Sequence, residues 1–531
     1  MEVKEIERYC CVVKVSDAFS EKKAVSCSGV IVHAQTGTVI CTGVPFSRFI
    51  TDQEPLSEDG SFLSADSFSE KLKIRLSFSA ERDLDPSQPA HGEAKPRSKT
   101  EQREVAAELL MLVNCLEFKQ AFLAVFQEAD QWRFHGDEED EELIRDAQFL
   151  SWFAVLKASV VCADSSPNSG TTPWQSSSPL QKGCPVVACG SPFGSLCLDL
   201  FISTLSRGII SNLAGEDNAV ILTDARCLPG TEGGGLFVVK GADDVRLVGL
   251  IVSPFGWKAT EWIGLTLVCS VNLIFRNIIR CTSIQDPLRD VWLHPREACL
   301  RMSNTALESK AAKYPTVCLV DSGQFWGSGV VVTPQLVVTC RHVVNGKPTV
   351  TLKFHHKDRV SDCVGDVLFF TKASSPYDLA LVQLRDSVTE AVVPRMAQSF
   401  NPGDSVVVVG YGGLGRRCGP SLTCGVLSKA IGWNDQPVML QTTCAVQAGA
   451  SGGAVVRSHS GELLGIVSSN TRDLAAKVTY PHLNFSIPVN IFQRLLKNFD
   501  QTRDVNVFRV LDTTEEEVKR VWRLQGVESK L

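Results

Sequence analysis

The chain has 531 residues, too many for one hydrophobic core, which predicts two to four domains. Hydrophobic residues make up 44% and charged residues 21% of the sequence, as is ordinary for a globular protein. The net charge of −6 provides no basic footprint for nucleic acid, so we expect no nucleic-acid partner.

The N-terminal sequence MEVKEIERYCC is charged where a secretory signal would be apolar, so we expect no secretion. The sequence contains no run of about 18 apolar residues, so we expect no membrane span. Without secretion, the 19 cysteines predict reduced thiols rather than a disulfide framework. Neither the pair Cys10-Cys11 nor the pair His355-His356 has partners at zinc-ligand spacing. With no nucleotide loop or cofactor fingerprint either, we expect no metal and no cofactor.

Short β-branched runs bounded by Gly, Pro or Asn recur along the chain. In chain order they are VSCSGVIV, VVACG, VRLVGLIV, SGVVV, LALVQL, SVVVVG, LLGIVS and NFSIPV. Their close spacing predicts antiparallel barrels or sandwiches rather than βαβ units. Periodicity predicts one or two helices over 104–128, and a C-terminal helix is predicted from Pro488 onward.

Polar or weakly patterned stretches divide the chain. Two of them are rich in polar residues and proline, and a third separates two apolar halves. The predicted organisation is a first domain over 1–281 with inserted linkers at 79–104 and 163–184, a connection over 282–312, a second domain over 313–500 and a C-terminal tail over 501–531.

The two halves repeat one outline. GASGGAV from Gly449 matches GTEGGGL from Gly230, an offset of 219 residues. Three further pairs occur in the same order: SGVIVHAQTGTVICTGV with SGVVVTPQLVVTCRHVV, STLSRGIIS with SLTCGVLS, and LVGLIVS with LLGIVS. Four matches in fixed order predict two copies of one β fold.

Ser451 lies in the glycine-rich stretch G-A-S-G-G. A serine hydroxyl becomes a nucleophile only beside a base that a third group orients, and the reaction also needs donors for the developing oxyanion. Flanking glycines permit a tight turn in which the N–H groups of Gly449 and Ser451 would form an oxyanion hole. Taken alone, the stretch fits a plain glycine turn equally well.

His342 and Asp378 are the best candidates for the other two roles. His342 follows the strand-like run LVVTCR, and Asp378 opens the strand-like run LALVQL after a turn signal. Each residue alone would be read as structural. The order His, Asp, Ser, with gaps of 36 and 73 residues, is that of chymotrypsin and differs from the order in α/β-hydrolases.

Residues 325–490 resemble the trypsin-like serine proteases of the HtrA or Deg type. The resemblance rests on GSGVVV, TCRHVV, YDLALV, GASGGAVV, LLGIVSSN and NFSIPV. It implies that His342 is the general base, that Asp378 orients it and that Ser451 is the nucleophile. The predicted fold class is therefore all-β dominated, with two trypsin-like double β-barrel domains in tandem, the first degenerate, and short helical segments.

Departures from secreted trypsins bear on activation and specificity. Val343 replaces a disulfide cysteine, and Ala450 replaces the aspartate that pairs with a freshly cut N-terminus. Ala445 stands at the base of the primary pocket, where it predicts a small or apolar substrate side chain, with Cys among the options. Main-chain pairing along 466–470 would hold the substrate as an added strand. The predicted substrate-binding residues are Ala445, Ile466, Val467 and Ser468.

The chain ends in Ser529, Lys530 and Leu531, the tripeptide address that the peroxisomal import receptor reads. With this tripeptide and the duplicated first half, the whole chain is similar to a family of peroxisomal processing proteases. That resemblance implies a peroxisomal matrix enzyme that trims imported matrix precursor proteins, including their N-terminal presequences, and cleaves itself. We also expect a homo-oligomer.

The first half lacks the triad. In the repeat alignment Gly43 stands opposite His342, Trp152 opposite Asp378 and Glu232 opposite Ser451. Glycine offers no base, and a glutamate in the oxyanion turn would repel developing negative charge. We therefore expect an inactive protease-like domain with a structural, regulatory or substrate-binding role, the alternative being an unrelated β domain.

Two other classes of function compete. One is a non-catalytic peroxisomal binding or chaperone module in which both halves are inactive; the intact second triad argues against it. The other is a hydrolase of acyl thioesters, which would need an α/β fold and the other residue order. The strand pattern does not support that fold.

Overall fold

The structure is a computed structural model of the chain. It describes all residues except 1–3, 19, 52–59, 82–99, 128–131, 134–147, 159–169, 240–243, 255–256, 259–260, 283–313, 357–358, 389, 413, 415–417, 474–477, 513–514 and 523–531. The chain forms two compact units. Unit 1 consists of Met1–Ala124, Arg133–Gly256 and Leu265–Arg301, and unit 2 of Val125–Trp132, Trp257–Gly264 and Met302–Leu531.

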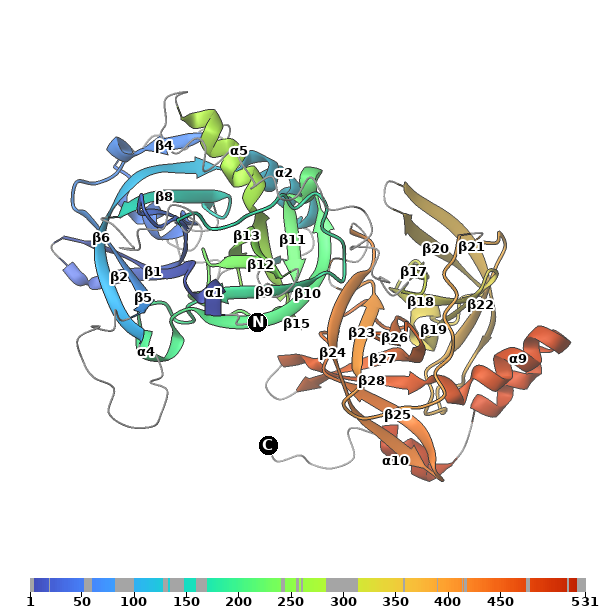
Figure 1. The fold of residues 1–531 in the computed structure, drawn as a ribbon. Coiled ribbons are helices and arrows are strands. Elements are labelled where there is room, and N and C mark those ends of the chain that lie inside the picture. Colours follow the sequence, from blue (N-terminus) through green and yellow to red (C-terminus); the bar gives the residue numbers. More distant parts are fainter. Residues whose placement is uncertain are drawn as a thin grey trace, which may run out of the picture. The chain divides into compact units, whose positions relative to one another are not determined.

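Unit 1 contains two closed six-stranded antiparallel barrels, coloured blue to green in Figure 1. The strands of the first barrel are, in order around it, β1 (Cys10–Asp17), β2 (Ser20–His33), β3 (Thr38–Thr42), β8 (Trp152–Ala158), β6 (Thr100–Asn114) and β5 (Leu72–Glu81), with β4 (Phe62–Ser64) added beside β6. Those of the second are β9 (Pro185–Gly190), β10 (Thr204–Ala214), β11 (Val220–Thr223), β16 (Thr266–Ser270), β13 (Val245–Ser253) and β12 (Gly235–Val239).

Unit 2 also contains two closed barrels, coloured yellow to red in Figure 1. The first consists of β17 (Val317–Asp321), β18 (Trp326–Thr333), β19 (Leu336–Thr339), β22 (Ala380–Leu384), β21 (Arg359–Phe370) and β20 (Thr349–His356). The second consists of β23 (Ser405–Gly410), β24 (Ser421–Trp433), β25 (Gln436–Thr442), β28 (Val478–Pro488), β27 (Leu463–Asp473) and β26 (Ala454–Arg457). A small separate sheet has the order β15 (Glu261–Trp262), β14 (Trp257–Lys258), β7 (Trp132–Arg133).

The barrels of the two units have the same cyclic strand order. The sequence β1-β2-β3-β8-β6-β5 corresponds strand for strand to β17-β18-β19-β22-β21-β20, and the second barrels correspond likewise. This arrangement confirms the predicted fold class of two trypsin-like double barrels in tandem.

The predicted β-branched runs form the barrel interiors because nearly all their side chains are buried. In β23, four consecutive valines from Val406 to Val409 are at most 3% exposed. Inside the barrels, some strand positions are glycine because a side chain from a neighbouring strand occupies the space that a Cβ would need. A Cβ at Gly329 would lie 2.6 Å from Val337, and a Cβ at the corresponding Gly29 would lie 2.9 Å from Val13.

The helix predicted over 104–128 is wrong in its first half. Residues Thr100–Asn114 form β6, and α2 begins only at Leu116. Along β6, Ala106, Glu108 and Leu110 are exposed while intervening residues are buried or half-buried, which is the alternation of a strand. Pairing with β5 and β8 overrides the helix propensity of the Ala, Leu and Glu residues.

The remaining helices are short. The α-helices are α1 (Lys4–Glu7), α2 (Leu116–Val125), α4 (Leu198–Phe201), α5 (Val271–Cys281), α7 (Arg341–Val344), α9 (Gln493–Thr502) and α10 (Glu516–Trp522). The 3-10 helices are η1 (Val44–Phe49), η2 (Ala65–Ser67), η4 (Glu216–Asn218), η6 (Val489–Ile491) and η7 (Val505–Leu511). Helix α9 confirms the C-terminal helix predicted from Pro488 onward. Pro488 itself is the last residue of β28 and is followed by η6 and then α9.

The described part of the 501–531 segment packs onto the barrels. Ser375 Oγ donates to the Leu511 carbonyl at 2.6 Å, and the Trp522 indole N–H donates to the Val438 carbonyl at 3.1 Å. The predicted connection at 282–312 lies outside the described residues from 283 onward. The predicted linker at 79–104 joins β5 to β6, which pair as far as Glu81 and Thr100, and its middle lies outside the described residues.

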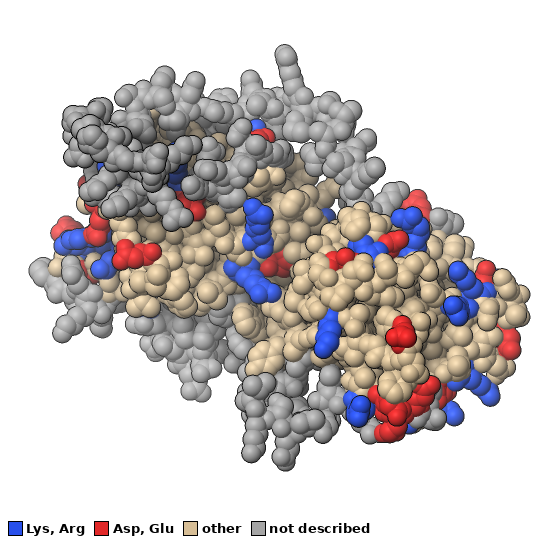
Figure 2. All heavy atoms as spheres, turned by 60° about the horizontal axis from the view of Figure 1, so that its bottom comes forward, with Lys and Arg blue, Asp and Glu red and all other residues tan. Residues whose placement is uncertain are grey.

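On the face shown in Figure 2, the Lys and Arg side chains of the described residues are interspersed with Asp and Glu. Every cysteine within the described ranges is a free thiol. In the part of the chain that the structure describes, no helix is long and apolar enough to cross a membrane.

Candidate active site

His342 is presented by the short helix α7, which follows β19 directly. Cys340 is the N-cap of this helix, and Asn345 ends it in a left-handed conformation with φ of 49°. The strand fixes where the helix begins, and the turn at Asn345 limits it to four residues. The His342 side chain is 50% exposed, so its ring faces solvent on one side while its backbone is held by the barrel.

Asp378 lies just before β22 and holds His342 at two points. Its Oδ1 accepts the His342 backbone N–H at 3.1 Å, and its Oδ2 is hydrogen-bonded to His342 Nδ1. Arg341 Nε is 3.7 Å from Oδ1. Burial raises the pKa of Asp378, but the hydrogen bond from His342 and the charges of His342 and Arg341 outweigh it, so the pKa lies below its ordinary value. Asp378 is therefore an ionised carboxylate that keeps a proton on Nδ1 and leaves Nε2 as an acceptor.

Ser451 lies in a turn that requires glycine on both sides. Gly449 has φ of +93° and Gly452 has φ of +86°. A Cβ at Gly452 would lie 2.0 Å from the Ser328 carbonyl oxygen, and one at Gly449 would lie 2.5 Å from the Tyr411 carbonyl oxygen. Gly449 and Gly452 are therefore glycines because a neighbouring backbone carbonyl lies too close to each of them for any side chain.

The amides of this turn divide into two groups. Ala450 N–H donates to the Gln447 carbonyl at 3.0 Å, Gly452 N–H to Val467 at 2.7 Å and Gly453 N–H to Ala450 at 2.9 Å. Within the described residues, the N–H groups of Gly449 and Ser451 have no acceptor. These two amides are the pair predicted from the sequence as the oxyanion hole.

The Ser451 hydroxyl donates to the Ser468 carbonyl at 3.2 Å. Among the described residues it makes no hydrogen bond to His342. The Ser451 hydroxyl is therefore bonded to β27 in this structure, while catalytic hydrogen bonds commonly tighten only when substrate binds.

Close packing brings α7 and the serine turn together. A Cβ at Gly327 would lie 2.6 Å from Val343 and 2.9 Å from the Ser451 carbonyl oxygen, so Gly327 fills the narrow space between them. The Cys340 thiol also donates to the Val467 carbonyl on β27 at 3.2 Å. The two barrels of unit 2 therefore meet where the three predicted catalytic residues lie.

Ser328 is a residue of the site that the sequence analysis missed. Its N–H donates to the Ser451 carbonyl and its Oγ to the Gly449 carbonyl, each at 2.8 Å. Its Oγ also accepts the Tyr411 N–H at 2.8 Å. Ser328 thereby fixes the serine turn against β18. The signal was present, because the repeat places Ser28 of SGVIV opposite Ser328 of SGVVV.

The predicted substrate-binding residues are placed as follows. Ala445 is 2% exposed, and its carbonyl accepts the Thr423 hydroxyl at 2.8 Å. Ile466 and Val467 are fully buried in β27, and Ser468 is 8% exposed. Of these, Ser468 is the residue that contacts Ser451 directly, through its carbonyl.

The turn in unit 1 has the same backbone but a different side chain. Gly230 has φ of +96° and Gly233 has φ of +83°. Ser28 donates its N–H to the Glu232 carbonyl and its Oγ to the Gly230 carbonyl, each at 2.8 Å, as Ser328 does in unit 2. At the serine turn the repeat alignment of Glu232 with Ser451 therefore agrees with the hydrogen bonds of the structure.

Glu232 fills its own turn. Its Oε2 accepts the Gly230 N–H at 2.6 Å, and its carboxylate also accepts the Glu232 N–H. Burial raises the pKa of Glu232, although these two hydrogen bonds act in the opposite direction. We expected the glutamate to repel an oxyanion from an open turn; instead the carboxylate occupies the two donors.

The strand registers confirm Trp152 at the position of Asp378 but correct the position given to Gly43. Cys41 pairs with Gly29 as Thr339 pairs with Gly329, so Gly43 stands at the position of Arg341 and Val44 at that of His342. A Cβ at Gly43 would lie 2.8 Å from both Cβ and the carbonyl oxygen of Trp152. Gly43 donates its N–H to that carbonyl at 2.7 Å. Trp152 is 3% exposed and packs against Phe149.

Among the described residues, one group of side chains is compact enough to hold a metal ion. The ligand atoms of Cys340, His342 and Asp378 lie within 4.8 Å of one another. Burial and the Asp378 charge raise the pKa of the Cys340 thiol well above its ordinary value. Two of these three residues, His342 and Asp378, belong to the predicted catalytic set, and Cys340 is the N-cap of α7.

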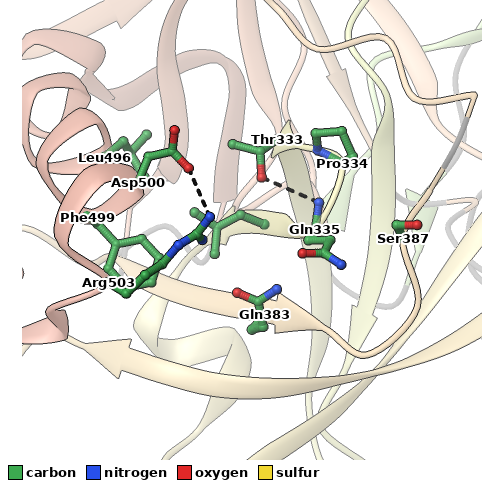
Figure 3. A pocket seen from close by; sticks show the side chains of 10 residues that line it. Thr333, Pro334, Gln335, Gln383, Ser387, Leu496, Phe499, Asp500 and Arg503 are labelled. Atoms are coloured by element: carbon green, nitrogen blue, oxygen red, sulfur yellow. Dashed lines mark hydrogen bonds and ion pairs between the residues drawn. The ribbon is translucent and has the colours of Figure 1, made fainter.

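A cavity of about 260 Å³ lies apart from the triad (Figure 3). Its lining residues are Thr333, Pro334, Gln335, Leu336, Gln383, Ser387, Leu496, Phe499, Asp500 and Arg503. Arg503 pairs with Asp500 at 3.3 Å, and Thr333 Oγ1 accepts the Gln335 N–H at 3.4 Å. No residue of the predicted catalytic site lines this cavity.

Residues 327–466, which hold His342, Asp378 and Ser451, match the family described as the trypsin-like peptidase domain. Together with the double barrel, this match makes unit 2 a protease domain of the trypsin type. Over 98% of its length the chain is 39% identical to the peroxisomal leader peptide-processing protease of Homo sapiens, of which it covers 96%. The protein of the same name from Mus musculus is also 39% identical, with the same coverage. The chain belongs to this family.

Solved structures are similar to one part of the chain. The Rv3671c protein of M. tuberculosis, in an inactive form, is 22% identical and covers 37% of this chain and 91% of its own, with a TM-score of 0.29.

Proposed function

We propose that this protein is a serine endopeptidase in which His342 is the general base, Asp378 orients it and Ser451 is the nucleophile. Asp378 holds the proton of His342 on Nδ1, which leaves Nε2 free to take the proton of Ser451 Oγ. Ser451 then attacks the substrate carbonyl carbon. The protonated His342 gives its proton to the leaving amine, and a water molecule hydrolyses the acyl-enzyme by the same steps.

The observation that carries this proposal is the contrast between the two turns. In unit 1 a carboxylate accepts the N–H groups of Gly230 and Glu232. In unit 2, among the described residues, the corresponding N–H groups of Gly449 and Ser451 have no acceptor. The same backbone thus holds a carboxyl group in one half and is open beside Ser451 in the other. Such donors stabilise the tetrahedral intermediate of acyl transfer.

The proposed substrates are imported proteins of the peroxisomal matrix, including precursors with N-terminal presequences. Two observations support this: the name of the 39% identical relatives, peroxisomal leader peptide-processing protease, and the terminal tripeptide from Ser529 to Leu531, which lies outside the described residues. The tripeptide would engage the peroxisomal import receptor and direct the enzyme to the matrix. Ala445 at the base of the primary pocket favours cleavage after a small or apolar residue.

The proposed domain organisation assigns residues 1–281 to an inactive protease-like domain and 313–500 to the active one, with a connection at 282–312 and a tail at 501–531. The occupied turn at Glu232 and the buried Trp152 at the position of Asp378 support the inactivity of the first domain. Self-cleavage between the two domains and homo-oligomerisation belong to the same proposal, because the resemblance to the family implies them.

A cleavage assay tests the proposed function. Wild type and Ser451→Ala are each incubated with a matrix precursor that keeps its presequence, and the products are sized and N-terminally sequenced. Trimming by wild type alone supports the proposal and names the residue at the cut. If neither protein trims the precursor but both bind it, the function is that of a binding module on a protease fold.

A further inference from the structure

One β-hairpin lies in the first half of the sequence but belongs to unit 2. Strands β14 and β15 lie between β13 and β16 in the chain, and Trp257 pairs with Trp262 across the hairpin. The segment Trp257–Gly264 nevertheless falls in unit 2, where β15 packs against β28. Its flanking strands are both part of the second barrel of unit 1.

The first contact of this hairpin is a hydrogen bond to the serine turn. Gln447 Nε2 donates to the Ile263 carbonyl at 2.7 Å. Gln447 is 4% exposed and Ile263 is 3% exposed, so this bond is shielded from water. A buried amide that lost its acceptor would carry an uncompensated desolvation cost, so the bond fixes the Gln447 side chain.

The second contact is backbone packing beside the primary pocket. Gly264 has φ of +68°, and a Cβ there would lie 3.2 Å from Pro481 Cγ and 3.5 Å from His482 Nε2. The Pro481 carbonyl accepts the N–H of Val446, which follows Ala445, at 2.9 Å. Gly264 thus lies against the segment of β28 whose Pro481 carbonyl holds Val446, the neighbour of the predicted pocket residue Ala445.

Gln447 connects the hairpin to the oxyanion hole. Its carbonyl accepts the Ala450 N–H at 3.0 Å and so closes the turn that carries Gly449. A shift of Gln447 moves this carbonyl and reorients the neighbouring amides of Gly449 and Ser451. Ala450 itself has no charged or polar side chain that could anchor the turn. The described contacts leave Gln447 and Ser328 as its side-chain anchors.

We propose that the Trp257–Gly264 hairpin, supplied by the inactive half of the sequence, completes the catalytic site by holding Gln447 and with it the oxyanion turn. Gln447 is a positioning residue, and the Ile263 carbonyl is its anchor. The inactive half is then required for turnover at Ser451. This inference rests on the proposed function of Ser451 as the nucleophile.

The test uses the full chain and two substitutions that break the contact from opposite sides. Gln447→Met keeps the length of the side chain and removes the donor. Gly264→Leu places a side chain against Pro481 and His482. The matched controls are Gln383→Met, outside the catalytic site, and Gly323→Leu, where φ is +87° and no atom lies within 4 Å of the added Cβ.

Four quantities are measured for each protein: kcat and KM on a peptide substrate, the rate of reaction with a fluorophosphonate, and the melting temperature. We expect about 10- to 100-fold lower kcat and phosphonylation rate for both test variants, approaching the loss seen when an oxyanion donor is removed. KM should change less than about threefold, because the turn acts in the transition state. The double variant should lose less than the product of the two single losses.

The outcomes are distinguishable. If wild type does not react with the fluorophosphonate, the proposed function fails and the inference fails with it. If wild type reacts and both folded variants react at the rate of their controls, the hairpin inference alone is overturned. A fall in melting temperature without a fall in kcat would also overturn it, since it would show a role in stability only.

Discussion

Replacement of Gly449 by alanine tests the oxyanion hole directly. A Cβ at this position would lie 2.3 Å from Trp326 Cζ3 and 2.5 Å from the Tyr411 carbonyl oxygen. The indole ring can move, but the Tyr411 carbonyl belongs to the backbone directly after β23 and cannot move without disturbing the barrel. The serine turn must therefore shift and take the Gly449 N–H with it.

The magnitude follows from two terms. An L-residue in a left-handed conformation costs about 1–2 kcal/mol, which lowers stability. The loss of one oxyanion donor costs about 10²–10³ in kcat, or about 2.7–4 kcal/mol in the transition state. Gly403 separates the terms, because it also has φ of +93° but no atom lies within 4 Å of its added Cβ.

The assay compares Gly449→Ala with Gly403→Ala in kcat, KM and melting temperature. Both variants should lose similar backbone stability, and only Gly449→Ala should lose about 10²–10³ in kcat with little change in KM. A Gly449→Ala protein that turns over within a few-fold of Gly403→Ala would refute the assignment of this amide.

Three further outcomes are expected. Asp378→Asn should lower kcat about 10⁴-fold while the protein still folds, because an amide can hold His342 in the wrong tautomer; steady-state kinetics with circular dichroism checks this. Glu232→Gln should melt no lower than wild type at pH 7. Because the pKa of Glu232 is raised in the folded state, the unfolded state ionises first as the pH rises above 4.5, and ionisation destabilises the fold above that pH. Below that pH both side chains are neutral, so the melting temperatures of Glu232→Gln and wild type, measured across pH, should no longer differ. The thiol of Cys340, buried and with a raised pKa, should resist iodoacetamide in the native state and react after denaturation, as mass spectrometry would show.

The barrels were predictable because their strands are local and strongly patterned. Runs such as the valines from Val406 to Val409 have few alternatives to a buried strand. Residues 104–114 were not predictable in the same way. Their composition favours a helix, and only pairing with β5 and β8, distant in the sequence, makes them a strand.

The candidate triad was predictable from residue order, since His342, Asp378 and Ser451 each end or begin a strand-like run. What the order does not contain is the hydrogen bonding of the turns. The carboxylate of Glu232 folds back onto its own amide and that of Gly230, and this depends on side-chain rotamer and burial. Repulsion was the natural expectation for a charge whose position was unknown.

The hairpin at Trp257–Gly264 shows a second limit. None of the predicted strands covers these residues, and the sequence does not say which barrel the hairpin packs on. The contact between Ile263 and Gln447 joins residues 184 positions apart. Contacts at this distance in the sequence depend on the assembled fold. A single sequence does not indicate which of its distant residues are in contact.

The most direct test of the central claim is labelling of the native, full-length protein with a fluorophosphonate, followed by peptide mass spectrometry. The account predicts one adduct, on Ser451, that is absent in Ser451→Ala and strongly reduced in His342→Ala. Glu232 and the unit 1 turn around it should carry none. A wild-type protein that folds but forms no adduct, or whose adduct lies on another serine, would contradict the assignment of Ser451 as the nucleophile.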